Sequence, residues 1–179
     1  IRLTSLVDGV LTLSHLSSDA FDIRLAPVTF DPLVQSVCES IAAEANNKQI
    51  GFEIDTAAGH TSVLGNDGQL ERMLFNLLSN AIKFTPNGGR ITVSTRASGT
   101  ELVLSVADTG IGIPVGEQEL VLQRFYRGSN ASEAFVSGTG LGLAIVDAIV
   151  NHHAGSIQLS SVIGGGTVAM VRIPILSDP

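Results

Sequence analysis

The sequence predicts an α+β fold, a two-layer α/β sandwich in which a mixed, mostly antiparallel sheet packs on three helices. Three segments carry apolar residues at helical spacing, and at least five others alternate or are rich in β-branched residues. Most of these strands are neighbours joined by short turns, which favours antiparallel pairing. The 179 residues, 44% of them hydrophobic, suffice for one domain with a sizeable core and an appended element.

The N-terminal part predicts a helix over about residues 1–18, followed by a linker over residues 19–30 that ends in a short strand. Asp31 and Pro32 are typical of a helix start, with Asp31 as N-cap and Pro32 at the first helical position of a helix that ends at residue 47. The first helix has an apolar seam, suited to packing on other helices, made of Leu3, Leu6, Val10 and Leu13.

The rest of the chain predicts alternating strands and helices, with a domain over residues 31–176. The expected elements are strands at 50–55 and 62–64, a helix at 69–84, strands at 90–95 and 102–106 about a turn at 97–100, a helix at 141–153, and strands at 156–162 and 167–173. Between the two hairpins lies a long Gly-containing stretch, residues 110–140, in which only a short helical island is expected.

Composition excludes several function classes. A net charge of -7 argues against an electrostatic surface for nucleic acid or an anionic membrane. Cys38 has no partner cysteine, so neither a disulfide framework nor a thiolate metal site is expected, and a reducing, cytosolic compartment fits best. No apolar run approaches the roughly 20 residues that span a bilayer. Because the chain begins without Met and in an expected helix, we predict that it is a fragment.

The helix expected at 69–84 carries an unusual polar stripe. Asn76, Asn80 and Lys83 fall within about 60° of one another around the helix axis, opposite a face of leucines. An Asn oxygen is a hard ligand suited to Mg²⁺, and a lysine ammonium binds phosphate. The alternative is a helix end with ordinary solvated polar residues.

Two glycine-rich motifs point to a nucleotide. "DTGIGIP", from Asp108 to Pro114, places a carboxylate at a strand end, where it can accept a hydrogen bond from an exocyclic amine such as that of adenine. "GTGLGLA", from Gly138 to Ala144, precedes a helix, and its free N–H groups suit phosphate. The alternative for "DTGIGIP" is an ordinary turn at the end of a strand, and the alternative for "GTGLGLA" is an ordinary helix start. A Rossmann site is excluded because the chain lacks "GxGxxG" after a strand.

A fourth motif, "QRFYRG", from Gln123 to Gly128, lies in the long stretch between the hairpins. Long loops of this kind are usually functional or disordered. Phe125 and Tyr126 are expected to anchor the loop to the body of the domain, while Arg124 or Arg127 reaches phosphate. A surface cluster is the alternative.

Taken in order, "NLLSNAIKFT", "DTGIGIP", "QRFYRG" and "GTGLGLA" resemble the N, G1, F and G2 boxes of the ATP-binding catalytic domain of sensor histidine kinases, in the Bergerat-type superfamily shared with gyrase and MutL ATPases. The leading helix resembles the second helix of the dimerisation and phosphotransfer domain of these kinases. The resemblance implies the cofactors ATP and Mg²⁺, with an ATP lid over about residues 114–139.

The resemblance also implies residue roles. Asn80 becomes the Mg²⁺ ligand, Asp108 the adenine reader, and Asn76, Asn80 and Lys83 the catalytic set. The implied nucleotide-binding residues are Asn76, Asn80, Lys83, Phe84, Asp108, Gly110, Gly112, Ile113, Tyr126, Arg127, Gly138, Thr139, Gly140, Leu141 and Gly142.

One position separates the branches of this superfamily. Its ATP hydrolases carry a Glu one turn before the metal Asn, where it activates water as a general base. This chain has Asn76 there, and an amide cannot take the proton. The resemblance therefore implies phosphoryl transfer to a positioned nucleophile, which depends on positioning and charge stabilisation.

The acceptor histidine of the family is missing from this sequence, because no "HELRTPL"-like stretch occurs. His15 lies on the wrong helix and no acid follows it, so it is expected to be a surface or seam residue. His152 and His153 are expected to be structural. We therefore predict a catalytic part that binds Mg·ATP but does not phosphorylate itself.

The resemblance further implies partners and a location. The partners are the kinase's own dimerisation domain and a response regulator. The parent protein is expected to be a homodimer, and the fragment a monomer or a weak dimer. The fragment is expected to be cytoplasmic, with a parent protein that is anchored in the cell membrane. Two other hypotheses remain at this point. One is a different enzyme, an anti-sigma-type Ser/Thr kinase or a gyrase/MutL-type ATPase, and the other is a non-catalytic nucleotide-binding module.

Overall fold

The computed structural model describes residues 24–59, 61–133 and 138–176. In these residues the elements follow the order β1, α2, β2, β3, α3, β4, β5, η1, η2, α4, α5, β6, β7. The helix expected over residues 1–18, and with it His15, lies outside the described residues. In the described part of the chain no helix is both long and apolar enough to span a lipid bilayer.

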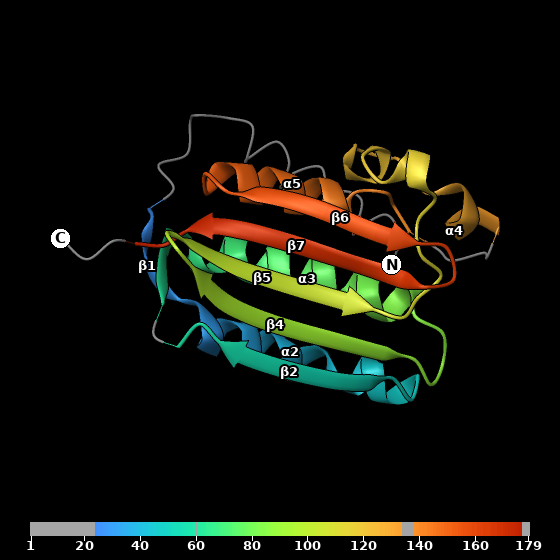
Figure 1. The fold of residues 1–179 in the computed structure, drawn as a ribbon, viewed down its shortest axis with the longest axis horizontal. Coiled ribbons are helices and arrows are strands. Elements are labelled where there is room, and N and C mark those ends of the chain that lie inside the picture. Colours follow the sequence, from blue (N-terminus) through green and yellow to red (C-terminus); the bar gives the residue numbers. More distant parts are fainter. Residues whose placement is uncertain (1–23, 60, 134–137, 177–179) are drawn as a thin grey trace.

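Five strands form the main sheet, in the order β2-β4-β5-β7-β6 (Figure 1). β2 runs parallel to β4, and the other neighbours are antiparallel. The predicted α+β fold with a mixed, mostly antiparallel sheet is therefore confirmed. The strand bounds are β2 (Gly51–Ala57), β4 (Arg90–Ser98), β5 (Glu101–Asp108), β6 (Ser156–Val162) and β7 (Gly166–Pro174).

The β4–β5 turn is shorter than predicted. Ser98 pairs with Glu101, so that Gly99 and Thr100 alone make the turn, whereas a turn over residues 97–100 was expected. Gly99 has a φ of 61°, the left-handed conformation that a two-residue hairpin turn requires.

A second, two-stranded sheet lies at one end of the domain. β1 (Ala26–Thr29) pairs antiparallel with β3 (Ser62–Gly65). Val63 also bridges Ile175, and Leu176 N–H donates to the carbonyl of Ser62 at 2.8 Å. Both strands were expected from the sequence, but their pairing with each other was not.

Three helices, α2 (Phe30–Asn47), α3 (Asp67–Phe84) and α5 (Gly142–His152), cover one face of the main sheet (Figure 1). Side chains alternate along each central strand, so that every second residue is buried under the helices. The buried residues of the central strands include Ile91, Val93, Leu102, Leu104, Val106, Ala169, Val171 and Ile173.

Helix α3 is anchored at both ends. Asn66 is its N-cap, and the Asn66 Oδ1 accepts a hydrogen bond from Gln69 N–H at 3.0 Å, so the helix begins two residues before the expected start. At the other end, Lys48 Nζ donates to the carbonyls of Ile82 (2.7 Å) and Thr85 (2.5 Å). An ammonium at a helix C-terminus satisfies orphan carbonyls and complements the helix dipole. The buried face of α3 consists of Leu70, Met73, Leu74, Leu77, Leu78, Ala81 and Ile82.

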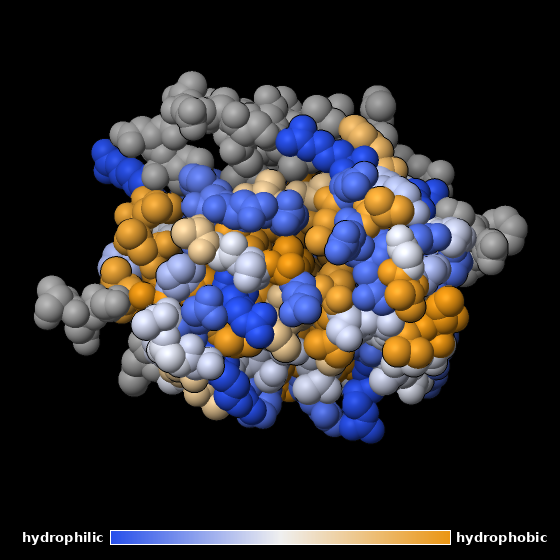
Figure 2. Space-filling model, turned by 45° about the horizontal axis from the view of Figure 1, so that its top comes forward, coloured by the Kyte–Doolittle hydropathy of each residue, from blue (hydrophilic) through white to orange (hydrophobic). Residues whose placement is uncertain are grey.

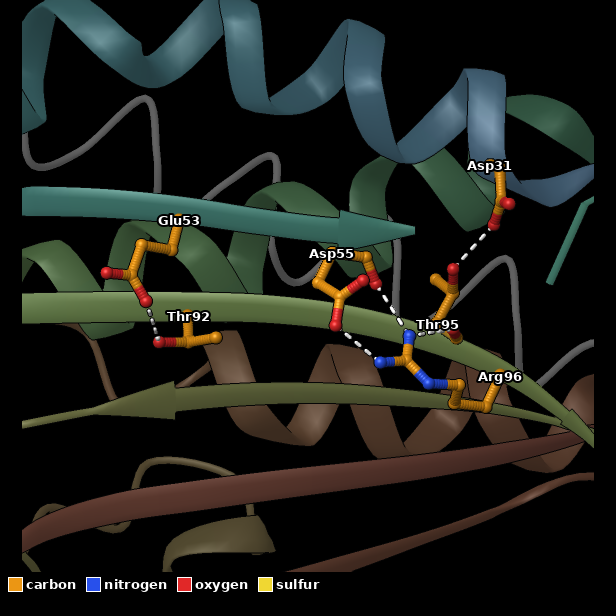
Figure 3. A network of polar contacts seen from close by, with 6 residues as sticks. All are labelled: Asp31, Glu53, Asp55, Thr92, Thr95 and Arg96. Atoms are coloured by element: carbon orange, nitrogen blue, oxygen red, sulfur yellow. Dashed lines mark hydrogen bonds and ion pairs between the residues drawn. The ribbon is translucent and has the colours of Figure 1, made fainter. Parts of the chain in front are cut away.

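Asp31 is not the N-cap of α2, contrary to the prediction. The helix begins at Phe30 with Thr29 as N-cap, and Asp31 lies buried within its first turn. Its Oδ1 accepts from Thr95 Oγ1 at 2.5 Å and its Oδ2 from Gly59 N–H at 2.8 Å (Figure 3). A buried carboxylate needs such hydrogen-bond partners. Asp31 therefore connects α2 to the sheet through Thr95 and does not cap the helix.

Polar contacts also link β2 to β4 on the solvent side of the sheet. Glu53 accepts from Thr92 at 3.5 Å, and Asp55 pairs with Arg96 (Figure 3). These side chains are exposed, and exposed ion pairs contribute little to stability. Their charges mark the β2 edge as a solvated strand.

Figure 2 shows hydrophilic and apolar side chains interspersed over one face of the molecule, and one of the apolar patches lies at the end where the β6–β7 turn lies in Figure 1. Val162 and Ile163 belong to this turn and are 67% and 64% exposed.

His153, the C-cap residue of α5, is buried and joins α5 to the start of α3. Its Nε2 accepts from Asn66 N–H at 3.1 Å, so Nδ1 carries the proton and donates to the carbonyl of Ile149 at 2.7 Å. Burial lowers the pKa of His153, and the neighbouring His152 adds to this effect. Both contacts require the neutral ring, in agreement with the expected structural role.

We predict that acidification destabilises the domain through His153. A lowered folded-state pKa means that, as pH falls below about 6.5, the unfolded chain takes up this proton more readily than the folded one. The free energy of unfolding should therefore fall between pH 7.5 and 5.5, as measured by urea unfolding. His153→Gln should flatten this dependence, whereas His152→Gln, at an exposed neighbour, should keep it. An unchanged slope in His153→Gln would contradict the assignment.

Candidate functional site

The polar stripe of α3 is half-buried rather than freely solvated. Asn76 Nδ2 donates to the carbonyl of Arg72 at 2.8 Å, which leaves its Oδ1 free to face away from the helix. Asn80 follows one turn later, and no hydrogen bond to another described residue is found for its amide. The stripe therefore holds amide groups available to a ligand.

The glycine-rich motif "GTGLGLA" lies directly against this stripe. A Cβ at Gly142 would lie 3.2 Å from Asn80 Nδ2 and 3.4 Å from Asn76 Oδ1, and a Cβ at Gly138 would overlap Lys83 Nζ. The fold thus brings together two motifs that are far apart in the sequence. Glycine at these positions allows the two motifs to approach this closely, because any side chain would meet the stripe.

Lys83 lies in a cationic environment. Burial lowers the pKa of its ammonium, and the nearby Arg127 guanidinium lowers it further. Lys83 Nζ also sits 4.7 Å from the centre of the Phe84 ring, a cation–π distance. Two like charges held near each other favour an anion between them. The arrangement therefore supports phosphate binding at this end of α3.

Asp108 ends β5 beside the end of α3. Its Oδ1 accepts from Gly110 N–H at 2.8 Å and from Thr167 N–H at 3.3 Å. Burial raises the pKa of this carboxyl, and the two hydrogen bonds oppose that rise. No hydrogen bond from another described residue reaches Oδ2, so that oxygen can accept one from a ligand. Gly110 is itself confined, because a Cβ there would lie 2.7 Å from the carbonyl of Phe84.

Two residues of this network were missed by the sequence analysis. Thr167 and Ser161 stand on β7 and β6, and their side-chain oxygens lie 2.8 Å apart. Ser161 Oγ also accepts from Ile113 N–H at 2.8 Å, which connects it to the "DTGIGIP" turn. No sequence signal marks these residues, because only the pairing of β7 with β5 places Thr167 opposite Asp108.

Gly112 lies against the β6–β7 hairpin rather than in open space. A Cβ there would overlap the carbonyl of Val162, and the Gly112 carbonyl accepts from Asn130 Nδ2 at 2.7 Å. The expected role of Gly112 beside a base is therefore indirect in this structure: it lets the "DTGIGIP" turn pack on the hairpin.

The "QRFYRG" motif is anchored by its backbone, not by the Phe125 side chain as predicted. Phe125 is 60% exposed, because its φ of 65° turns the ring outward. Its N–H instead donates to the carbonyl of Gly140 at 2.9 Å. Tyr126 is half-buried, as an anchor should be. The middle of the long stretch between the hairpins therefore meets its C-terminal end at Gly140.

The start of α5 differs slightly from the prediction. The helix begins at Gly142, and Leu141, which is 2% exposed, is its N-cap. Leu141 N–H is 3.4 Å from Thr139 Oγ1. A surface pocket also exists at the other end of α3, but none of the predicted site residues line it. Its lining includes Arg24, Pro27, Leu33, Asn66 and Asp67.

Comparisons with known proteins identify relatives of the whole chain. A family model described as histidine kinase-, DNA gyrase B-, and HSP90-like ATPase matches residues 65–177. The sensor histidine kinase RppB of Synechocystis is 36% identical over 180 residues, which are 99% of this chain and 39% of RppB. The sensor-like histidine kinase SenX3 of Mycolicibacterium smegmatis is 37% identical over 178 residues, 99% of this chain and 46% of SenX3.

The fold has solved counterparts. The crystal structure of full-length ShkA in complex with AMPPNP superposes with a TM-score of 0.85 at 28% identity, covering 98% of this chain and 36% of ShkA. The chain thus spans 39–46% of the length of the two curated relatives.

We predict that Gly140→Ala destabilises the domain more than Gly99→Ala. Both glycines have left-handed φ values, 72° and 61°, so both variants carry the same backbone strain. At Gly140 the new Cβ would also lie 2.7 Å from the Phe125 carbonyl carbon, whereas nothing lies within 4 Å at Gly99. Overpacking of this kind costs about 1–3 kcal/mol. Equal losses in urea unfolding would show that the Gly140 contact is unimportant.

Proposed function

The chain belongs to the histidine kinase-, DNA gyrase B- and HSP90-like ATPase family, as a catalytic domain of the sensor histidine kinase type, and from that premise we propose that it binds Mg·ATP and presents the γ-phosphoryl group to a histidine. The observation that carries this proposal is the contact of Gly138 and Gly142 with Lys83 and Asn80. It brings together a cation, amides and glycine backbone, the features that a triphosphate requires.

Asp108 selects the base in this proposal. Its Oδ2 is available to accept a hydrogen bond, while Oδ1 is held by Gly110 and Thr167. Adenine offers an exocyclic amine donor. A half-buried carboxylate that accepts from it loses little solvation on binding, because it is already partly desolvated.

Asn80 is the proposed ligand of Mg²⁺, and its surroundings fit that group. The amide lies beside Gly142, where a Cβ would be 3.2 Å from Nδ2, and no described residue occupies its hydrogen-bonding groups. A hard cation takes an amide oxygen and keeps the rest of its shell for water and phosphate oxygens. When bound, Mg²⁺ would supply charge neutralisation of the phosphates.

Lys83 and Arg127 supply the remaining positive charge. Lys83 stands one turn after Asn80, and burial together with the positive charge of Arg127 lowers the pKa of its ammonium. A phosphate group between them would relieve their mutual repulsion. We propose that Thr139, Gly140 and Leu141 line the same region from the other side, because the chain there begins α5.

Asn76 disfavours hydrolysis. Its Nδ2 is already engaged by the Arg72 carbonyl, and an amide oxygen cannot take a proton from water at neutral pH. Transfer to a separate nucleophile, driven by positioning and charge stabilisation, fits this residue better.

We propose further that the parent protein is a homodimer anchored in the membrane, with this portion on the cytoplasmic side. The acceptor histidine would lie on its dimerisation segment, and the phosphoryl group would pass on to a response regulator. The names of the curated relatives, sensor histidine kinases matched along 99% of this chain, support the transfer to a histidine.

We predict that the chain binds ATP and that Asp108→Asn and Asn80→Ala weaken binding in different ways. Losing a buried hydrogen-bond partner costs about 1–3 kcal/mol, so Asp108→Asn should weaken binding about 10- to 100-fold with or without Mg²⁺. Asn80→Ala should weaken it only when Mg²⁺ is present. The exposed Asp55→Asn serves as control and should match the wild type. Isothermal calorimetry that detects no ATP binding by the wild type would refute the proposal.

We predict that the isolated chain neither labels itself nor releases phosphate at an appreciable rate when incubated with γ-labelled ATP. The reasons are the amide at Asn76 and the lack of a family-type acceptor in this sequence. Adding the dimerisation segment of the same parent should produce acid-labile label on that segment. Stable label on His15, or steady phosphate release, would point to a different enzyme class.

A further inference from the structure

The loop segment 115–131 follows the "DTGIGIP" turn and contains η1 (Val115–Glu117), η2 (Leu120–Leu122) and the start of α4 (Ser129–Glu133). Two hydrogen bonds hold it to the sheet end of the domain. Gln118 Nε2 donates to the carbonyl of Ser161 at 2.8 Å, and Asn130 Nδ2 donates to that of Gly112 at 2.7 Å. These contacts fix both ends of the segment but not the "QRFYRG" motif between them.

A third set of contacts is internal to the segment and centres on Glu117. Its Oε2 accepts from Ser129 N–H at 2.8 Å, and its Oε1 accepts from Ser129 Oγ at 2.6 Å. Burial raises the pKa of the Tyr126 hydroxyl, and the nearby Glu117 carboxylate raises it further. Hydrogen bonds to an ionised acceptor are shorter and stronger than neutral ones. The Ser129 contacts accordingly lower the pKa of Glu117 and keep it charged.

The residues that interact with Glu117 flank Arg127. Tyr126 precedes Arg127 and Ser129 follows it by two positions, so the backbone is held on both sides of the arginine. The adjacent Phe125 N–H donates to Gly140, which ties the motif to the glycine-rich segment. A side chain whose backbone is fixed on both sides loses less conformational freedom when it binds.

The like charges of Arg127 and Lys83 explain why the backbone of the "QRFYRG" motif has to be fixed. The glycine-rich segment that Phe125 N–H binds touches Lys83, because a Cβ at Gly138 would overlap Lys83 Nζ. Arg127 and Lys83 are both cations and repel each other, and this repulsion adds to the effect of burial in lowering the pKa of Lys83. A loose segment would move the exposed Arg127 away from Lys83. Glu117 counters this by accepting two hydrogen bonds from Ser129, and these keep the "QRFYRG" backbone in place.

We propose that Glu117 is a positioning residue for phosphate binding: by accepting two hydrogen bonds from Ser129 it fixes the backbone that carries Arg127, so that Arg127 and Lys83 together contact the phosphate groups of ATP. The inference rests on the proposed function, and it adds a residue that no sequence motif marked. It concerns the phosphates only, because the hydrogen bonds of Glu117 go to Ser129, whereas those of Asp108 come from Gly110 and Thr167.

The test compares ATP with adenosine in Glu117→Ala. ATP affinity, measured by calorimetry with Mg²⁺, should fall about five- to tenfold, as expected for one charge-assisted contact. Adenosine affinity, measured by NMR titration, should stay unchanged. Glu119→Ala is the matched control, since Glu119 is an exposed carboxylate two residues away in the same loop and should leave both affinities unchanged.

A double-mutant cycle tests whether Glu117 acts through Arg127. Arg127→Ala alone should weaken ATP binding, and adding Glu117→Ala should weaken it no further. Additive losses, or equal losses for ATP and adenosine, would overturn the inference. Should Glu117→Ala fail to fold by urea unfolding, Ser129→Ala removes one of the same hydrogen bonds from an exposed position and should weaken ATP binding in the same direction.

The two proposals can fail separately. If the wild type binds no ATP, the proposed function is wrong. If the wild type binds ATP and Glu117→Ala binds it as tightly as Glu119→Ala does, the proposed function stands and the positioning role of Glu117 is wrong.

Discussion

The site depends on one helix that must satisfy two opposite environments. On one side, α3 buries seven apolar residues against the sheet and the neighbouring helices, so its axis and rotation are set by core packing. On the other side it presents Asn76, Asn80 and Lys83 to the closely packed glycines of the "GTGLGLA" motif. Any shift of α3 that moved the stripe would also disturb the core, and this coupling makes the stripe rigid.

The ends of α3 are held by contacts from distant parts of the chain. Lys48, at the end of α2, binds the last carbonyls of α3, and His153, at the end of α5, binds the backbone at its start. Both contacts use groups whose charge state matters: the lysine must be charged and the histidine neutral. The position of the stripe thus depends on two polar groups that lie outside all four recognised motifs.

Electrostatics divides the site into two parts. At the end of the site proposed for adenine, Asp108 is partly desolvated. Its Oδ1 accepts the hydrogen bonds from the protein, which leaves Oδ2 for a ligand. At the phosphate end, Lys83 and Arg127 are held near each other despite their like charges. The Glu117 contacts with Ser129 give a physical reason for that proximity, since they hold the backbone that carries the arginine.

The sequence by itself determined the fold class, the order of nearly all described elements and the four motifs, because periodicity, turn residues and motif spacing are local properties of the chain. It did not determine which elements meet. The glycines of α5 face the amides of α3, and Thr167 stands opposite Asp108, only because of helix packing and strand register. Asp31 does not cap α2 as predicted, because its carboxylate is buried and accepts a hydrogen bond from Thr95 on β4. The Phe125 side chain turned outward because its backbone, not its ring, carries the contact. Such choices depend on contacts between residues distant in sequence, and these exist only once the chain has folded.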